Sequence, residues 1–449
     1  MIKHDENLEV SSAVRKVVEN AGWLLVLRIL RILWALFVTG YLARYLGPEK
    51  FGILSYSVAL VALFSPVARF GLEGVVVREI VRDERNTGEI LGTTFALRLF
   101  FSLLTVVLAI LTVFFLRQDD DVSLKLVAII SIGIPFTAFD TVDLWFQSRV
   151  MSKYSVYARS AALFATNGLK VVLIVIGASL FAFGVTVSLE YITTGIGLVI
   201  VYRLVGNSMS GWKPRWTRAR ELLSKSWPLM LSGALAMVYL RIDQVMLREM
   251  VGEKEVGIYS TAVRLSEVWY YVPFAISASV FPYLVRTREL SRDTYRRRFQ
   301  QLFDILVGIA IVVAVVVTIF SSWIVRVIFG GAYTSAGVIL AIHIWAGIFV
   351  FTREALGRWF VNEGMMIFSF ISAGTGALVN VVLNILLIPY HGAVGAAVAT
   401  VISYAVSGYL ICFFSRRSFE VGLAITRALL IPFRIGEYLG GLRSGGDKG

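Results

Sequence analysis

The stretch GPEKFGILS at residues 47–55 returns as GEKEVGIYS at residues 252–260. Both glycines, the isoleucine and the serine coincide, and each copy joins the first hydrophobic segment of its half of the chain to the second. If each half holds six membrane spans, both halves begin on the same side, so the pattern predicts a parallel internal repeat. Chance similarity between two loops is the alternative, and the matching position within each half argues against it.

The composition indicates that this chain is surrounded mostly by lipid. Of its 449 residues, 57% are hydrophobic and only 16% are charged, and the mean hydropathy is +0.76. Soluble proteins carry about 25% charged residues, so this chain lacks the polar side chains to cover a surface in water. The composition predicts an all-α integral membrane protein and excludes a disordered chain or a coiled coil.

Twelve hydrophobic segments account for most of the length, because a spanning helix needs roughly 20 apolar residues. They are expected at residues 19–45, 51–72, 90–116, 123–147, 155–178, 182–204, 227–250, 257–284, 299–320, 334–357, 366–388 and 393–414. These segments predict an N-terminal segment (1–18), an N-lobe (19–204), a linker (205–226), a C-lobe (227–414) and a tail (415–449). The tail is expected to be either a helix at the membrane interface or a disordered segment.

Positive charge is distributed unevenly over the predicted connections. One alternating set holds Arg78, Arg82, Arg85, Arg149, Lys153, Arg159, Lys213, Arg215, Arg218, Arg220, Lys225 and the arginines between residues 286 and 298. Cytoplasmic connections are enriched in such residues, so both termini are expected in the cytoplasm and the protein in the cell membrane. The same asymmetry explains the formal net charge of +13, and no nucleic-acid partner is expected.

Five arginines within the spans are candidates for a binding site, because charges in the membrane usually face a cavity or a partner. Arg28 and Arg31 share a face of the first span, and Arg241 lies in the corresponding span of the second half. Arg69 and Arg264 lie in the second span of each half. Guanidinium groups are suited to phosphate, so these arginines predict a cationic cavity; structural pairing with acidic residues is the alternative for each.

Four acidic residues within the spans could couple transport to a proton or sodium gradient. Asp140 and Asp143 share a face of the fourth span, Asp243 lies two residues after Arg241, and Glu267 lies three residues after Arg264 on the same helix face, where the two could pair. Each could instead neutralise an arginine. Trp269 is a candidate for stacking on a sugar ring, with helix packing as the alternative.

Motifs of soluble enzymes are absent from the sequence. It contains no Walker A motif for ATP hydrolysis, no Gly-x-Ser-x-Gly and no His-Glu-x-x-His. The single cysteine, Cys412, cannot form a disulfide within the chain, and three scattered histidines are too few for a metal cage. We therefore expect neither an enzyme nor a bound cofactor, apart from a coupling proton or sodium ion.

Three stretches give the sequence a family resemblance. They are ARYLGPEKFG (43–52), then RIDQVML (241–247) with GIYS (257–260) and AVRL (262–265), and finally NVVLNILLIP (380–389) with GAVGAA (392–397). In this order and on a twelve-span frame, they resemble polysaccharide-biosynthesis flippases of the Wzx type. The same superfamily holds the MATE drug exporters and the lipid II flippase.

The resemblance implies two six-helix lobes around a V-shaped cavity. It also implies movement of a polyprenyl-pyrophosphate-linked oligosaccharide from the inner to the outer leaflet, driven by an ion gradient. Similar flippases carry cavity arginines on their first, second and eighth helices, where Arg28, Arg31, Arg69 and Arg264 lie in this chain. The resemblance makes the lipid-linked glycan and the bilayer the expected partners, with glycan polymerases or transferases as candidate neighbours.

Two other functions remain to be distinguished from a flippase. A MATE-like exporter of organic cations would have an acidic or neutral cavity. A scaffold that only helps to assemble a glycan synthase would tolerate the removal of any cavity charge.

Overall fold

The computed structural model describes the backbone of residues 2–117 and 120–434, and the side chains from residue 30 to 434 except those of residues 118, 119, 278, 282, 289, 290 and 366. All regular elements in these ranges are helical. An all-helical chain is compatible with a lipid bilayer, because a helix satisfies its backbone hydrogen bonds internally.

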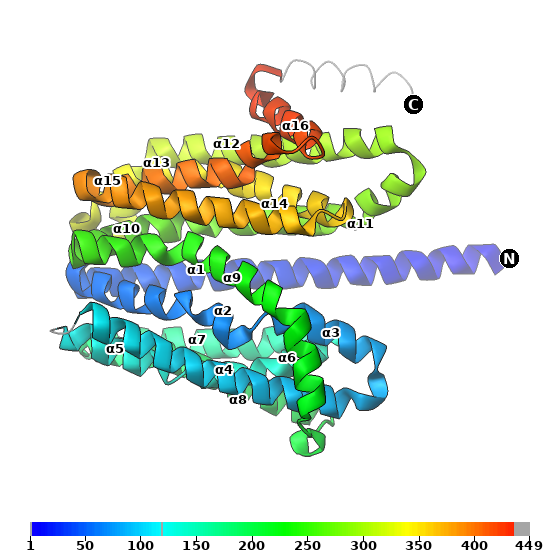
Figure 1. Ribbon diagram of the computed structural model, residues 1–449, viewed down its shortest axis with the longest axis horizontal. Coiled ribbons are helices and arrows are strands. Elements are labelled where there is room, and N and C mark those ends of the chain that lie inside the picture. The colour runs from blue at the N-terminus through cyan, green and yellow to red at the C-terminus, as the bar shows by residue number, and fades with distance from the viewer. Residues whose placement is uncertain (1, 118–119, 435–449) are drawn as a thin grey trace.

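The first half of the chain forms one lobe and the second half forms the other (Figure 1). The N-lobe contains α1 (Ile2–Leu63), α2 (Ser65–Arg69), α3 (Leu72–Arg82), α4 (Thr87–Leu116), α5 (Asp121–Ser131), α6 (Asp140–Ser148), α7 (Lys153–Val175) and α8 (Leu180–Leu204). The C-lobe contains α9 (Trp216–Met250), α10 (Glu253–Glu267), α11 (Tyr271–Leu290), α12 (Arg292–Phe329), α13 (Ala336–His343), α14 (Ala346–Asn362) and α15 (Met366–Gly408). A last helix, α16 (Phe419–Leu429), follows the C-lobe.

These elements make the predicted twelve crossings. Nine segments of the described chain are long and apolar enough to cross a membrane. Two of them hold two crossings each, because α1 breaks at Gly47 and α15 breaks at Gly392, both with positive φ. The remaining crossing consists of α10 and α11, where Arg264 and Glu267 lower the hydropathy. The all-α, twelve-helix architecture expected from the sequence is confirmed.

The two lobes share a hydrophobic core at one end of the molecule, which we call the joined end. It carries the turns at Gly47, Gly252 and Gly330. Phe51 of α1 lies in one cluster with Tyr259 of α10. Burial of such aromatic side chains stabilises the contact by roughly 1.5–3 kcal/mol each.

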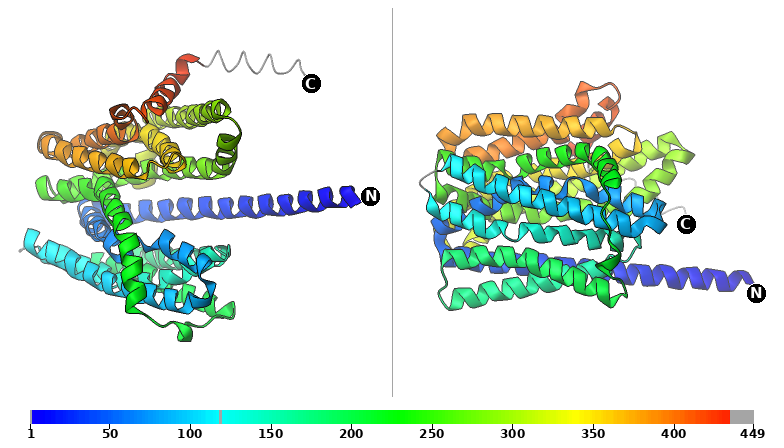
Figure 2. Two further views of the ribbon diagram at one scale, coloured as in Figure 1. Left: turned by 45° about the vertical axis from the view of Figure 1, so that its right-hand side comes forward. Right: turned by 60° about the horizontal axis from the view of Figure 1, so that its bottom comes forward.

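At the opposite end, which we call the divided end, each lobe has a core of its own. One cluster contains buried residues of α11, α12, α14, the short segment after α15 and α16, and another contains residues of α3, α4 and α6 with the first turns of α9. Figures 1 and 2 show the helices of the two lobes separating toward this end, with α1 running between them. The predicted V-shaped arrangement of two lobes follows from this distribution of cores.

Helix α9 begins at Trp216, earlier than the expected span at 227, and its first turns pack on the N-lobe. Lys225 pairs with Glu79 at 3.0 Å and Arg218 pairs with Asp83 at 2.9 Å. A hydrogen bond from Asn86 and the guanidinium of Arg218 hold the pKa of Asp83 below its usual range. The first turns of α9 are therefore fixed to the N-lobe, although the rest of the helix belongs to the C-lobe.

The predicted tail begins with helix, because α16 lies within it. Val421, Ile425 and Ala428 are buried in the core of the C-lobe, and Arg296 of α12 pairs with Glu420 at 2.6 Å. Of the two alternatives for the tail, residues 419–429 adopt the helical one, while residues 435–449 lie outside the described part of the chain. The position of α16 relative to a membrane stays a prediction.

Candidate functional site: a cationic cavity between the lobes

A cavity of about 950 Å³ lies between the lobes and is built from both of them. Its walls come from α1, α7, α9, α10, the short segment after α10, α11 and α14. A volume of this size can hold a drug-sized group or a phosphorylated sugar.

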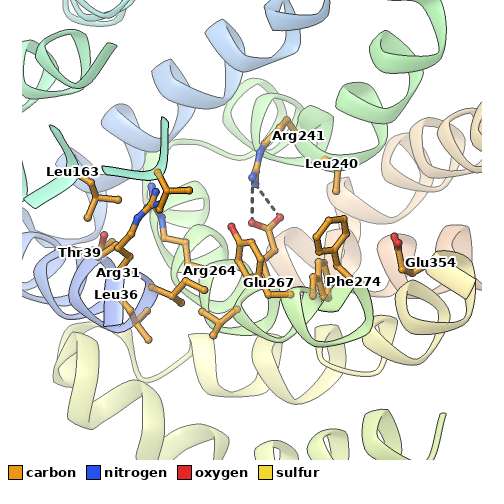
Figure 3. Close-up of a pocket in the computed structure, with 16 residues that line it drawn as sticks. Arg31, Leu36, Thr39, Leu163, Leu240, Arg241, Arg264, Glu267, Phe274 and Glu354 are labelled. Carbon is orange, nitrogen blue, oxygen red and sulfur yellow. Dashed lines mark hydrogen bonds and ion pairs between the residues drawn. The ribbon is translucent and has the colours of Figure 1, made fainter. Parts of the chain in front are cut away.

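Three of the predicted arginines line the cavity: Arg31, Arg241 and Arg264. Figure 3 shows the side chains of Arg31 and Arg264 on one side and Arg241 opposite Glu267. Each arginine comes from a different helix, α1, α9 or α10, so only the folded chain brings them together. The side chain of Arg28 lies outside the described side chains.

Arg241 and Glu267 form a two-pronged ion pair. Nη1 and Nη2 of Arg241 donate to the two carboxylate oxygens of Glu267, both at 3.1 Å. Glu267, predicted as a coupling residue, therefore neutralises Arg241 in this conformation. Arg264 lies with its guanidinium carbon 5.7 Å from the ring centre of Phe51, a contact that leaves its charge in place.

The charge of the cavity leans positive. Among the described lining residues there are three arginines and two glutamates, Glu267 and Glu354. Aromatic side chains complete the wall, namely Tyr270, Tyr271 and Phe274. The cavity thus combines donors suited to an anion with aromatic faces suited to sugar rings.

Trp269 does not line this cavity. Its side chain is 37% exposed, and its neighbours Tyr270 and Tyr271 provide the aromatic surface instead. The sequence WYY at residues 269–271 located the aromatic group but could not show which ring faces inward.

Arg69, Asp140 and Asp143 belong to the N-lobe and are not among the residues that line the cavity. Arg69 is largely exposed at the end of α2 and lies 3.8 Å from Glu73. Asp140 and Asp143 both bind Arg159 of α7, at 2.6 and 3.3 Å. The sequence pattern places Arg159 in a connection between spans and therefore does not predict this pairing.

Asp243 is buried inside the C-lobe in a network of polar side chains. The hydroxyls of Tyr259 and Thr400 donate to one carboxylate oxygen at 2.6 and 2.7 Å. The Asn384 amide donates to the other oxygen at 2.9 Å and to Asn380 at 3.1 Å. In the described structure, Oδ1 of Asn384 is buried without a hydrogen-bond partner. Asn380 and Asn384 both belong to the stretch NVVLNILLIP (380–389). Two asparagines within an apolar span were the only sign of this network in the sequence.

Comparisons with known proteins agree with this architecture. A family model described as polysaccharide biosynthesis protein matches residues 17–288, and a MatE model matches residues 228–386. A probable low-salt glycan biosynthesis flippase of Haloferax volcanii, Agl15, is 23% identical over 82% of this chain and 77% of its own length.

Two solved structures show the same fold. The lipid II flippase MurJ, in an inward closed conformation, matches with a TM-score of 0.71 at 15% identity, over 93% of this chain and 92% of its own. A multidrug MATE transporter, in an inward-facing conformation, matches with a TM-score of 0.67 at 15% identity, over 90% of this chain and 95% of its own. Because the first family model covers more than half of the sequence, this chain belongs to the polysaccharide biosynthesis protein family.

Proposed function

We propose that this protein is a flippase that moves a polyprenyl-pyrophosphate-linked oligosaccharide from the inner to the outer leaflet of the cell membrane. The observation that carries the proposal is the cavity between the lobes, where Arg31, Arg241 and Arg264 face one space. Guanidinium groups in a site of low dielectric constant favour a pyrophosphate over a cation. The similarity to Agl15, described as a probable low-salt glycan biosynthesis flippase, and to the lipid II flippase MurJ supports this class of substrate.

The distribution of charge supports one orientation of the protein in the membrane. The arginine-rich connections lie at the divided end, so this end is assigned to the cytoplasm together with both termini. The head group would enter between the lobes from the cytoplasm, while the prenyl tail stays in lipid.

Release on the other side requires the joined end to open. Charged side chains hold it closed in the present conformation: Arg117 of the N-lobe binds Glu249 of α9 at 3.1 Å, and Arg248 binds Asp120 at 2.6 Å. In the same region, Nε of Arg44 donates to the carbonyl of Ile328 at 3.0 Å. Alternating access would break these contacts and close the divided end.

The polar network around Asp243 is our candidate for the binding site of the coupling ion. Asp243 contributes a carboxylate, and Asn384 contributes an amide oxygen without a partner in the described structure. A sodium ion or a proton bound there would change the charge of the network between α9, α10 and α15. Asp140 and Asp143 are weaker candidates because both already pair with the guanidinium of Arg159.

Transport in proteoliposomes tests the function directly. The substrate is a polyprenyl-pyrophosphate-linked sugar with a fluorescent label, and a membrane-impermeant reductant bleaches only the label in the outer leaflet. We expect the wild-type protein to make nearly all of the label accessible to the reductant, whereas with Arg264→Ala only the label that already lies in the outer leaflet should be bleached. Arg298→Ala, at an exposed arginine of α12, is the matched control. Efflux of a lipophilic cation without movement of the labelled lipid would identify a MATE-like exporter, and no movement of either would favour a scaffold.

A further inference from the structure

A second recess lies along one face of α14, beside the central cavity. It has a volume of about 400 Å³. It is lined by Val350, Arg353, Glu354, Gly357, Arg358 and Val361. Neither of its arginines was assigned a role by the sequence, and neither lines the central cavity.

Aromatic rings hold both arginines of the recess without removing their charge. The guanidinium of Arg353 lies 5.0 Å from the ring centre of Tyr239, and in the described structure it forms no ion pair with a carboxylate. The guanidinium of Arg358 lies 5.5 Å from the ring centre of Phe281 and pairs with Glu354 at 3.2 Å. An arginine that stacks on a ring keeps N–H donors at its edges for an anion.

The recess adjoins the central cavity. Glu354 lines both spaces. Phe274 lines the central cavity, and its ring centre lies 5.9 Å from the guanidinium of Arg358. Figure 3 shows Phe274 between the Arg241–Glu267 pair and Glu354. An anion at Arg358 would therefore lie beside Phe274 and Glu354, two side chains that also form the wall of the central cavity.

The recess lies on the cytoplasmic side of that path in our assignment. Helix α14 runs from Ala346 toward Asn362, and Arg288 at the end of α11 donates to the carbonyl of Asn362. Arg353 and Arg358 are five residues apart, which is about 7.5 Å along a helix. They thus form two successive cationic positions on the route from the divided end to the central cavity.

We propose that the α14 recess is a staging site that binds the phosphate of the lipid-linked substrate before it reaches the central cavity. This inference rests on the proposed flippase function and adds a second anion site to it. The recess carries two arginines against one glutamate, and local positive potential raises the association rate of an anion. A phospholipid head group offers the same phosphate chemistry, so the test has to separate the two sources.

Association and dissociation rates distinguish a staging site from the main site. We would use surface plasmon resonance on the full chain in nanodiscs, with farnesyl pyrophosphate as the soluble prenyl probe. Arg353→Ala and Arg358→Ala should each lower the association rate about tenfold at low salt and less at high salt, with an unchanged dissociation rate. Arg264→Ala should instead raise the dissociation rate. Arg298→Ala is the control, because Arg298 also stacks on a tyrosine, Tyr283, but lies outside both cavities.

One variant tests the sign of the charge effect. Glu354→Gln removes the carboxylate that pairs with Arg358, so it should raise the association rate. A variant that had merely damaged the fold could not produce this gain. Arg358→Lys should retain most of the wild-type rate, because it keeps the charge.

The possible failures are distinct. If the wild-type protein does not bind farnesyl pyrophosphate, the flippase proposal fails and the staging site fails with it. If the wild type binds but the α14 variants associate as fast as Arg298→Ala, the staging site alone is refuted. If dihexanoyl phosphatidylglycerol binds with the same dependence on Arg353 and Arg358 and displaces the probe, the recess is a general phospholipid site and the proposal is overturned.

Discussion

Gly52 and Gly257 occupy equivalent positions in the two repeats and cross each other at the joined end. A Cβ on Gly52 would lie 1.9 Å from the carbonyl oxygen of Glu253, and a Cβ on Gly257 would lie 2.0 Å from that of Pro48. The contact is reciprocal, because Glu253 stands in the second repeat where Pro48 stands in the first. The glycines of the repeated stretch therefore allow the backbones of the two lobes to meet.

Replacing either glycine should loosen the joined end. A methyl group at Gly52 or Gly257 cannot fit against the opposing backbone, and such overpacking typically costs about 1–3 kcal/mol. We expect Gly52→Ala and Gly257→Ala to widen the distance between spin labels on the two lobes at this end. Gly168→Ala is the control, because a Cβ there meets no atom within 4 Å. Distances equal to those of the control would show that the crossing does not hold the lobes together.

The same repeat shows what the sequence could and could not predict. The break at Gly47 and the count of twelve crossings followed from hydropathy and from local motifs, because these features depend on neighbouring residues. The partners of Asp243 come from α10 and α15, far apart in the sequence. Likewise, Arg241 and Glu267 were predicted for different roles, and only packing of α9 against α10 places them 3.1 Å apart. Pairing across helices could not be predicted from a single sequence.

Releasing Arg241 from its partner should strengthen the binding of an anion. Glu267→Gln keeps the shape of the side chain but removes the charge that competes with the substrate. A hydrogen bond to a charged group contributes about 1.5–3 kcal/mol, so the affinity for farnesyl pyrophosphate should rise by about 10- to 150-fold. Isothermal titration calorimetry measures this change. An unchanged affinity would show that the Arg241–Glu267 pair lies away from the bound substrate. A weaker affinity would show that the substrate contacts the intact pair.

Asp243 and Asp140 should differ in their effects on ion coupling. Asp243→Asn should remove the dependence of transport on a sodium or proton gradient, because the network loses its only carboxylate while keeping its shape. Asp140→Asn should lower the melting temperature, because it removes the shorter of the two ion pairs of Arg159, while the gradient dependence stays. Transport measured with and without each gradient separates the two variants. Gradient dependence retained in Asp243→Asn and lost in Asp140→Asn would exchange their roles.

The contact between Arg248 and Asp120 makes the joined end sensitive to acid. Burial acts to raise the pKa of Asp120, but hydrogen bonds from Ser123 and the Arg248 guanidinium hold this pKa below its usual range. A carboxylate with a lowered pKa stabilises the folded contact above its ordinary pKa of about 3.9, and this stabilisation is lost as the pH falls through the lowered value. Spin-label distances across the joined end should therefore stay constant from neutral pH down to about 4 and widen below it. Asp120→Asn should show the wider distance at neutral pH and a weaker response to acid. A full acid response in Asp120→Asn would assign the sensitivity to other carboxylates at this end, such as Glu249 or Glu253, rather than to Asp120.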